Sequence, residues 1–453
     1  MSDFSDSHSI ASGRHKGKKH IVIVGAGIIG VCTAYYLVKN PKFDPHMMHI
    51  SLVEGKRVAG GASGKAGGLL ALWAFPQQLV PLSFQLHQEL SDTYGGENEW
   101  DYRRLTTVML EGDVSHIGSD AEEDDYVSPQ EHSDADNSAD ERPRQASDVP
   151  RILKTRKLPN DLNWINETVV TQCSSLGGKY TTAQVQPYRF TNFLLKKALE
   201  DSKGALELIL GKVNKICYLM ETGMATGIRY EPTSAKITQT EKHADQISLL
   251  GDQIVLCVGP WSSKILPDCP ISALRAHSIT ITPYKNQKMS PYAIFTEFKT
   301  GPSTYTSPEV YARKDEVFVC GESDSAVDVP ETTDDVEVVK SKCDELFKQV
   351  GKISPALRKG RILKRQACHL PVLDVPSSNG PLIGETNIMN LFLCSGHSCW
   401  GINNAPASGK VMSELLLEGR AKSAEISSLD PSLYFNASVL VSDDEDDHFN
   451  SDF

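Results

Sequence analysis

The chain has 453 residues, of which 40% are hydrophobic and 23% charged, proportions that are ordinary for a soluble globular protein. This length exceeds what one small core needs, so we expect two domains or one large composite domain. The formal net charge of −12 is concentrated in two acidic segments, residues 119–148 and 443–453, and no basic face that would suit nucleic acid is visible.

Residues 1–18 are polar, and we expect them to form a disordered lead. This lead lacks the apolar segment of a secretion signal, and no apolar run in the chain reaches the ~20 residues of a membrane helix. We therefore predict a cytoplasmic protein without a membrane span. The ten cysteines include no C-x-x-C pair and no His/Cys metal spacing, which predicts reduced core thiols and no metal site.

An apolar strand at residues 20–24 leads into the sequence GAGIIG and then into a helix at residues 31–39. Gly25 permits a tight turn, Gly27 lets the backbone approach a pyrophosphate, and Gly30 lets the helix and the strand pack closely. The phosphates would lie at the helix N-terminus, where free N–H groups and the helix dipole favour anions.

A second strand, at residues 48–53, ends in Glu54, which lies 24 residues beyond Gly30. This spacing suits a carboxylate that accepts hydrogen bonds from ribose hydroxyls. The strand, the turn, the helix and the acid together predict a dinucleotide site. A Gly-rich turn in some other α/β fold is the alternative.

A second Gly-rich stretch, residues 59–70, follows Glu54 almost at once and bears on the choice between FAD and NAD. Such a stretch is more than a nicotinamide cofactor needs, and it suits a longer cofactor that runs close to the backbone. FAD is therefore the predicted cofactor, and an NAD-dependent dehydrogenase is disfavoured. The stretch contains Ala-Ser-Gly followed closely by Gly-Gly-Leu, and it resembles the D-amino-acid oxidase superfamily of FAD enzymes, which includes glycine oxidase and sarcosine oxidase. A plain flexible loop is the alternative.

The remaining elements are predicted from periodicity and turn residues. Helices are expected at residues 76–94, 186–202 and 331–350, strands at 105–111 and 254–259, an antiparallel sheet at 273–283, 291–298, 309–312 and 317–321, and a strand, loop and helix at 391–417. The stretch 113–150 is rich in Asp, Glu, Ser and Pro and poor in aromatic residues, so we expect a disordered acidic insertion there.

The resemblance implies an α/β fold with a Rossmann-like FAD-binding domain and an antiparallel-sheet substrate domain, similar to glutathione reductase and D-amino-acid oxidase. The FAD-binding domain is expected to be discontinuous, over residues 19–84, 170–270 and 361–435. The substrate domain is expected over residues 85–169 and 271–360, and an acidic disordered tail over residues 436–453.

Near the C-terminal end, Gly396 and His397, followed by Gly401 at a predicted helix start, resemble the closing FAD motif of the family. When a substrate gives a hydride to flavin N5, negative charge develops at the N1–C2=O edge. A helix N-terminus at Gly401, with the N–H groups of Ile402 and Asn403, would stabilise that charge. His397 would tune the flavin or act on a substrate proton, or would serve only as a structural hydrogen-bonding residue.

Departures from the family pattern bear on the substrate. Glycine oxidases carry an Arg that grips the substrate carboxylate, and the matching position here is Leu370. A second basic residue lies within the Gly-His motif of some members, where this chain has Cys399 and Trp400. A simple amino acid is therefore not the expected substrate. The candidate catalytic residues are Trp400 and His397. The other candidates for a carboxylate grip are Arg104, Arg275, Arg313 and Arg365.

Further cofactor contacts follow from the resemblance. Val213 would contact adenine, Gly259 and Trp261 follow a late cofactor-contacting strand, and Cys368 aligns with the cysteine that bonds covalently to flavin in sarcosine-oxidase-like enzymes. A buried free thiol is the alternative for Cys368. The predicted cofactor-binding residues are Gly25, Gly27, Ile28, Ile29, Gly30, Glu54, Ser63, Gly64, Ala66, Gly67, Gly68, Val213, Gly259, Trp261, Gly401, Ile402 and Asn403.

These features favour an FAD-dependent oxidoreductase that oxidises a C–N bond of a small amine or amino-acid derivative by hydride transfer to flavin N5. The alternative comes from the Gly-His-Ser and Trp-Gly-Ile segment at residues 396–402 and from Lys410, which resemble a fungal branch of FAD oxidoreductases linked to sorting between late endosome and Golgi. On that hypothesis the protein is a flavin-binding regulator or adaptor with little or no turnover, associated with late endosomes. The acidic insertion and tail would then bind a protein partner; otherwise they are solvated disorder.

Overall fold

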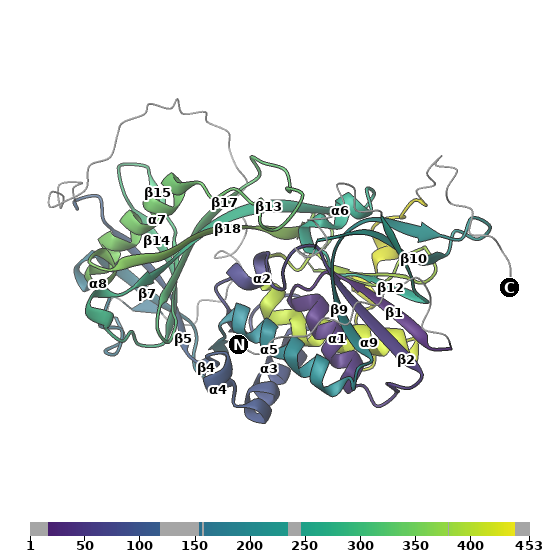
Figure 1. Ribbon diagram of the computed structural model, residues 1–453. Helices are drawn as coiled ribbons and strands as arrows, with labels where there is room; N and C mark the ends of the chain where they lie inside the picture. The colour runs from purple at the N-terminus through teal and green to yellow at the C-terminus, as the bar shows by residue number, and fades with distance from the viewer. Residues whose placement is uncertain (1–16, 118–153, 156–157, 234–245, 379, 440–453) are drawn as a thin grey trace.

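The structure of the protein, a computed structural model, describes residues 17–117, 154–155, 158–233, 246–378 and 380–439. Two large sheets stand at the two ends of the molecule, and long strands run from one end toward the other (Figure 1). Most of the predicted lead, acidic insertion and acidic tail lies outside the described residues. Where they are described, Asp113 is the last residue of a strand, and Ala437 is buried and exchanges two hydrogen bonds with Asn387. Regular structure therefore continues into residue 113, and a packed segment includes residue 437.

The first sheet has eight strands with a parallel centre. Its parallel strands are β9 (Leu206–Tyr218), β2 (Met48–Glu54), β1 (Lys19–Val24), β12 (Gln253–Leu256) and β20 (Leu391–Ser395), in that spatial order. Antiparallel strands β10 (Ala225–Pro232), β11 (Ile247–Leu250) and β19 (Leu382–Glu385) extend its two edges.

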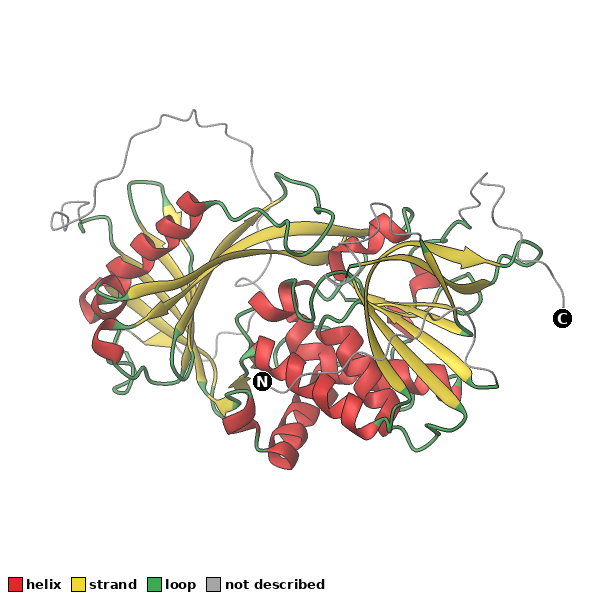
Figure 2. Ribbon diagram, viewed as in Figure 1, coloured by secondary structure: helices red, strands yellow, loops and turns green. Residues whose placement is uncertain are grey.

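Both faces of β1 are covered, which explains its continuous run of apolar residues. Ile21 and Ile23 belong to one buried cluster, whereas Val22 and Val24 belong to another. Helices α1 (Ile28–Lys39), α3 (Val80–Tyr94), α5 (Pro187–Asp201) and α9 (Gly401–Glu418) pack together beside this sheet (Figure 2). The carboxyl ends of β1, β2 and β12 lie close to the start of α1.

The second sheet is antiparallel, as predicted, except for one parallel pair. Its strands are, in spatial order, β18 (Arg361–Leu373), β13 (Ile271–Thr282), β17 (Val317–Asp324), β16 (Glu309–Ala312), β14 (Tyr292–Lys299), β5 (Thr106–Asp113), β7 (Val170–Gly177) and β6 (Lys154–Thr155), with β15 (Tyr305–Thr306) beside β14. The parallel pair is β5 with β14. Helices α7 (Lys340–Ile353) and α8 (Pro355–Arg358) lie at this end of the molecule (Figure 1).

Several predicted boundaries were wrong. The helix predicted to start at residue 76 starts at Val80. Residues 76–79 form a separate turn, and Pro81 lies in the first turn of the helix. The helix predicted at 331–350 begins only at Lys340, and residues 330–334 instead lie beside the first sheet. The Gly-rich stretch 59–70 contains a short helix, α2 (Ala62–Lys65), and the start of β3 (Leu69–Ala71), which joins β8 (Thr182–Gln184) and β4 (Arg103–Arg104) in a small third sheet. The other short helices are α4 (Gly96–Glu99) and α6 (Ser262–Ile265).

Candidate functional site

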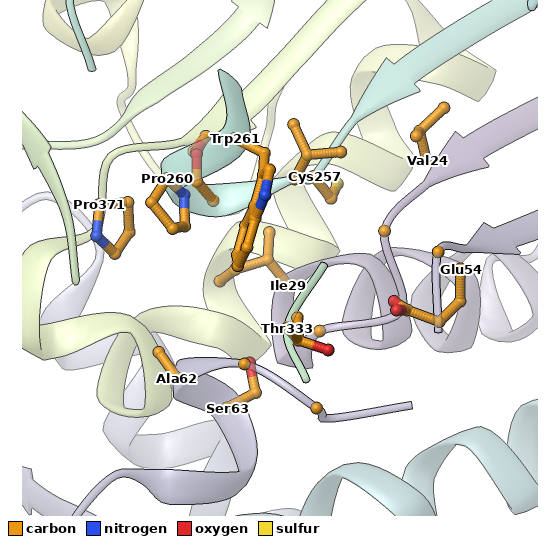
Figure 3. Close-up of a pocket in the computed structure, with 18 of the residues that line it drawn as sticks. Val24, Ile29, Glu54, Ala62, Ser63, Cys257, Pro260, Trp261, Thr333 and Pro371 are labelled. Carbon is orange, nitrogen blue, oxygen red and sulfur yellow. The ribbon is translucent and has the colours of Figure 1, made fainter. Parts of the chain in front are cut away.

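A cavity of about 360 Å³ lies at the carboxyl ends of β1, β2, β12 and β20; we call it the first cavity. In the view of Figure 3, Glu54 lies toward one end and Pro371 toward the other, with the ring of Trp261 and the hydroxyl of Thr333 between them. The predicted residues that line this cavity are Gly25, Gly27, Ile28, Ile29, Glu54, Ser63, Ala66, Val213, Gly259, Trp261, His397, Gly401 and Ile402. The structure therefore brings together residues that are spread over almost 380 positions of sequence.

The turn from β1 into α1 requires glycine at two positions. Gly25 has a φ of +99°, and a Cβ atom there would lie 2.6 Å from the carbonyl oxygen of Cys257. A Cβ atom on Gly30 would lie 1.9 Å from the carbonyl oxygen of Gly25. Because neither position tolerates a side chain, the helix N-terminus sits directly against the strand ends. Gly30 does this without lining the cavity itself.

The N-terminus of α1 has the geometry of an anion site. The first intrahelical bond runs from the N–H of Val31 to the carbonyl of Gly27, so the preceding N–H groups face outward from the helix end. The N–H of Ile28 donates to the Ser63 hydroxyl at 2.9 Å. A Cβ atom on Gly27 would lie 3.1 Å from the same hydroxyl, so little space separates the two segments. Free N–H groups and the helix dipole at this point suit the phosphates of a dinucleotide.

The Glu54 carboxylate is held at the end of β2 by backbone donors. Its Oε2 accepts from the N–H of Ala26 at 2.9 Å, and its Oε1 accepts from the N–H of Lys56 at 3.0 Å. Burial raises the pKa of Glu54, and these hydrogen bonds partly offset that shift by favouring the ionised form. A carboxylate has about four acceptor positions, so Glu54 can still accept a hydrogen bond from a ribose hydroxyl.

A strap of residues 330–334 covers part of the first cavity, which sequence reasoning did not predict. Glu331 forms salt bridges with Lys212 of β9 and with Lys264 of α6, the latter at 2.9 Å. The indole N–H of Trp261 donates to the carbonyl of Pro330 at 2.7 Å. Residues 331–333 all line the cavity. The strap is therefore held to β9 and α6 at the carboxyl-end edge of the first sheet.

His397 lines the first cavity but is tied to α9. Its Nε2 lies 2.9 Å from the Ser408 hydroxyl, which itself donates to the carbonyl of Asn404. Because that hydroxyl has one hydrogen, His397 donates from Nε2 and its Nδ1 is unprotonated. Burial lowers the pKa of His397 to about 3, so the ring is neutral at physiological pH. This geometry favours the structural hydrogen-bonding alternative over proton transfer.

A second cavity, of about 110 Å³, lies between the Gly-rich stretch and the second sheet. The predicted residues that line it and not the first cavity are Gly67, Gly68, Cys368 and Trp400. Four residues line both cavities and so form a wall that the two spaces share: Ala66, Leu370, Cys399 and Ile402. Burial raises the pKa of the Cys368 thiol to about 11, which disfavours the thiolate that a covalent flavin link would need and favours the buried-thiol alternative.

Gly64 and Asn403 line neither cavity and have packing roles. A Cβ atom on Gly64 would lie 2.2 Å from the carbonyl oxygen of Ala59. The side-chain oxygen of Asn403 accepts from the N–H of Ala71 at 2.8 Å and so ties the start of α9 to β3. Both residues therefore support the site without facing it.

None of the four arginines considered as carboxylate grips lines either cavity. Arg275 pairs with Asp324 and Glu337, and Arg365 pairs with Asp344. The other two hold the protein itself. Arg104 donates to Gln88, and Arg313 pairs with Glu316 and donates to the carbonyls of Ala66 and Gly67. Sequence reasoning missed Lys65 and Glu309, the two ionisable residues of opposite charge that line the second cavity.

Within the described ranges, no helix combines the length and apolarity needed to cross a membrane, and no group of His, Cys, Asp and Glu side chains is arranged to hold a metal ion. Eight cysteines are free thiols: Cys32, Cys173, Cys257, Cys269, Cys320, Cys343, Cys368 and Cys394.

Comparison with known proteins shows which family and which solved structures the chain resembles. The profile of the family described as "FAD dependent oxidoreductase" matches residues 20–415. The protein named "Putative oxidoreductase TDA3" of Saccharomyces cerevisiae is 49% identical, over 94% of this chain and 96% of its own. L-proline dehydrogenase from P. horikoshii has a TM-score of 0.65 at 18% identity, over 91% of this chain and 97% of its own. Glycine oxidase from Bacillus cereus has a TM-score of 0.62 at 16% identity, over 90% of this chain and 96% of its own. The predicted fold class is confirmed.

Proposed function

The chain belongs to the family of FAD-dependent oxidoreductases, and we propose that it oxidises a C–N bond of a small amine or amino-acid derivative. The observation that carries this proposal is that the two cavities lie side by side and share part of their lining. The first has the glycine turn, helix N-terminus and carboxylate that suit FAD, and the second is a smaller space that shares Ala66, Leu370, Cys399 and Ile402 with it. Two proteins of the same fold are named for acting on L-proline and on glycine, both of which contain a C–N bond.

The residues of the first cavity fit FAD in three parts. The N-terminus of α1 would hold the phosphates, Glu54 the ribose and Val213 the adenine. Gly259 has a φ of +56° and open space where a Cβ atom would stand, so its backbone can approach the cofactor closely. These features leave the end near Gly401 for the flavin ring.

Bound FAD supplies the hydride acceptor, and the protein contributes binding and electrostatics. Helix α9 begins at Gly401, which lines the first cavity, and its second residue, Ile402, lines both cavities. The N–H groups and dipole of this helix end would stabilise the negative charge that accompanies hydride transfer. The buried aromatic and aliphatic side chains around the second cavity would exclude water from the reacting bond.

An anaerobic reduction screen of the full-length protein tests this function. The purified protein should be yellow, and one or more members of a panel of primary, secondary and tertiary amines should bleach the oxidised-flavin spectrum. Mass spectrometry of the denatured chain, run in parallel, reports whether Cys368 carries flavin; its burial predicts a polypeptide of unmodified mass.

Two results would contradict the proposal. A protein that stays colourless with added FAD would remove the cofactor-based reasoning altogether. A yellow protein that no amine or amino acid reduces would remove the C–N oxidation. That second result would favour the flavin-binding regulator of late endosome-to-Golgi sorting, whose acidic segments lie largely outside the described residues.

A further inference from the structure

The floor of the second cavity is one face of the second sheet. Glu309 lies opposite Cys320 in the pairing of β16 with β17, and Tyr311 lies opposite Phe318. Because side chains alternate between the two faces of a strand, residues two apart point to the same side. All four of these residues line the cavity. A carboxylate thus stands among aromatic side chains on the surface that a substrate would meet.

Glu309 is held at one oxygen. Its Oε2 accepts hydrogen bonds from the hydroxyl of Tyr311 and from the thiol of Cys320. Among the described residues, no hydrogen bond reaches Oε1. That oxygen is not among the fully buried atoms that lack a hydrogen-bond partner, so it keeps some exposure. Burial raises the pKa of Glu309, and no cationic side chain in the described part of the chain forms a salt bridge with it. A cation in the cavity would supply a compensating charge.

Aromatic rings surround the space beside this carboxylate. Tyr311 stacks on Phe318 with ring centroids 5.8 Å apart, and Phe295 meets Tyr311 at 6.1 Å in an edge-on arrangement. Trp400 lies on the α9 side and also lines the cavity. Aromatic faces attract ammonium groups, most strongly where water is excluded, and methylated ammonium groups are recognised by such rings.

Besides Glu309, the described lining includes two side chains that can carry a positive charge, Lys65 and His277. The ammonium of Lys65 already donates to the carbonyl of Ala367 at 2.9 Å, and burial lowers its pKa. His277 accepts the N–H of Val339 at Nε2, and burial lowers its pKa too. Both groups lie on the β13 and β18 side of the floor, so neither neutralises Glu309 by direct pairing.

Resting on the function proposed above, we propose that Glu309 and the rings of Phe295, Tyr311, Phe318 and Trp400 form a subsite for a substituted ammonium group. The substrate is then a cationic alkylamine, and its charged nitrogen lies against Oε1 of Glu309. A substrate carboxylate at the same end would be repelled by Glu309, which agrees with the absence of an arginine from the described lining of both cavities.

Binding of a cation that cannot be oxidised tests this subsite separately from turnover. Tetramethylammonium has no lone pair on nitrogen, so it can bind without forming an iminium product. Its binding to the FAD-loaded full-length protein is followed by isothermal titration and by the change in flavin absorbance. We expect Glu309→Gln to weaken binding about tenfold or more, because the charge is lost while the amide oxygen can still accept from Tyr311 and Cys320.

Two further variants keep the result specific. Glu297→Gln removes the same charge from an exposed position on the neighbouring strand β14 and should leave binding unchanged. Phe295→Leu should weaken tetramethylammonium binding while leaving binding of uncharged tert-butanol within a factor of about two, because only the cation uses the ring's charge distribution. This second variant tests the subsite even if Glu309→Gln does not fold into a yellow protein.

The outcomes separate the two proposals. Equal binding of tetramethylammonium to the wild-type protein and to Glu309→Gln would overturn the subsite, and so would tighter binding of acetate that is lost in Lys65→Met. If amines bleach the flavin equally well in Glu309→Gln, the proposed function stands and the subsite falls. If cation binding depends on Glu309 while no amine bleaches the flavin, the subsite stands and C–N oxidation falls.

Discussion

Replacement of His397 by asparagine is expected to make the stability of the protein less sensitive to acid. The imidazole is buried beside α9, donates to Ser408, and has a pKa lowered by burial to about 3. An unfolded histidine has a pKa of about 6.5. Below that value the unfolded chain binds a proton at this residue that the folded protein does not. Stability contributed by the neutral ring is therefore lost as the pH falls from about 6.5 toward about 3.

The size of this loss follows from the pH range and the unfolded pKa. One such histidine lowers the free energy of unfolding by about 1.4 kcal/mol for each pH unit, which amounts to about 2.5 kcal/mol between pH 7.5 and 4.5. That range lies above the folded pKa, so its exact value has little influence on the result. Because folded proteins are stable by only about 5–15 kcal/mol, a loss of this size is measurable.

The measurement is denaturant unfolding at pH 7.5, 6.5, 5.5 and 4.5, followed by tryptophan and flavin signals. His397→Asn should be less stable than the wild type at pH 7.5, with a gap that narrows by about 2.5 kcal/mol at pH 4.5. His46→Asn is the matched control, because its ring is exposed in the folded state. If the stabilities of the wild type and of His397→Asn run parallel with pH, the ring is not a buried neutral group, and a proton-transfer role for it returns to consideration.

Two further predictions concern the first cavity. Gly27→Ala should fold but bind FAD at least about tenfold more weakly, because its Cβ meets only the Ser63 hydroxyl, at 3.1 Å, and otherwise intrudes where phosphate would lie. Gly30→Ala should instead lower the free energy of unfolding by about 1–3 kcal/mol, because its Cβ meets the backbone of Gly25. Flavin fluorescence titration and thermal unfolding separate these effects, and equal behaviour of the two variants would contradict the assignment of separate roles. Glu331→Gln should speed FAD dissociation by about two- to fivefold at low salt and by less at high salt, because both partner lysines are near the surface. A dissociation rate that neither the substitution nor salt changes would show that the strap does not retain the cofactor.

Local geometry explains which parts of the site were predictable from sequence. Gly25, Gly30 and Glu54 belong to one strand–turn–helix–strand unit, and their spacing follows from the dimensions of that unit. Residues 331–334 of the strap were wrongly predicted as part of a helix, because the contacts of Glu331 with Lys212 and Lys264 join segments more than 60 residues apart. Helical periodicity carries no information on such contacts.

The substrate side was harder to predict for a related reason. Four arginines were reasonable candidates because arginine suits a carboxylate, but the structure engages each with the protein; Arg313, for example, holds the carbonyls of Ala66 and Gly67. Glu309 was not predicted as a site residue, because a single acid at the start of a short strand is typical of any protein surface. Its place in the cavity depends on the register of β16 with β17, which sequence alternation alone does not determine.

The ionisable groups of the two cavities differ in their hydrogen bonds, and this difference bears on which cavity would bind a charged substrate. Around the first cavity, both oxygens of Glu54 accept from backbone, and His397 is neutral and donates to Ser408. Those groups are fixed by the chain before any ligand arrives, as a permanent cofactor site requires. In the second cavity, Glu309 is held at Oε2 by Tyr311 and Cys320, while Oε1 accepts no hydrogen bond from the described residues. A carboxylate that is oriented by the protein but left uncompensated gains most from a ligand that brings the opposite charge. The electrostatics of the site therefore favour a cationic substrate even though the sequence motifs of the family specify only the cofactor.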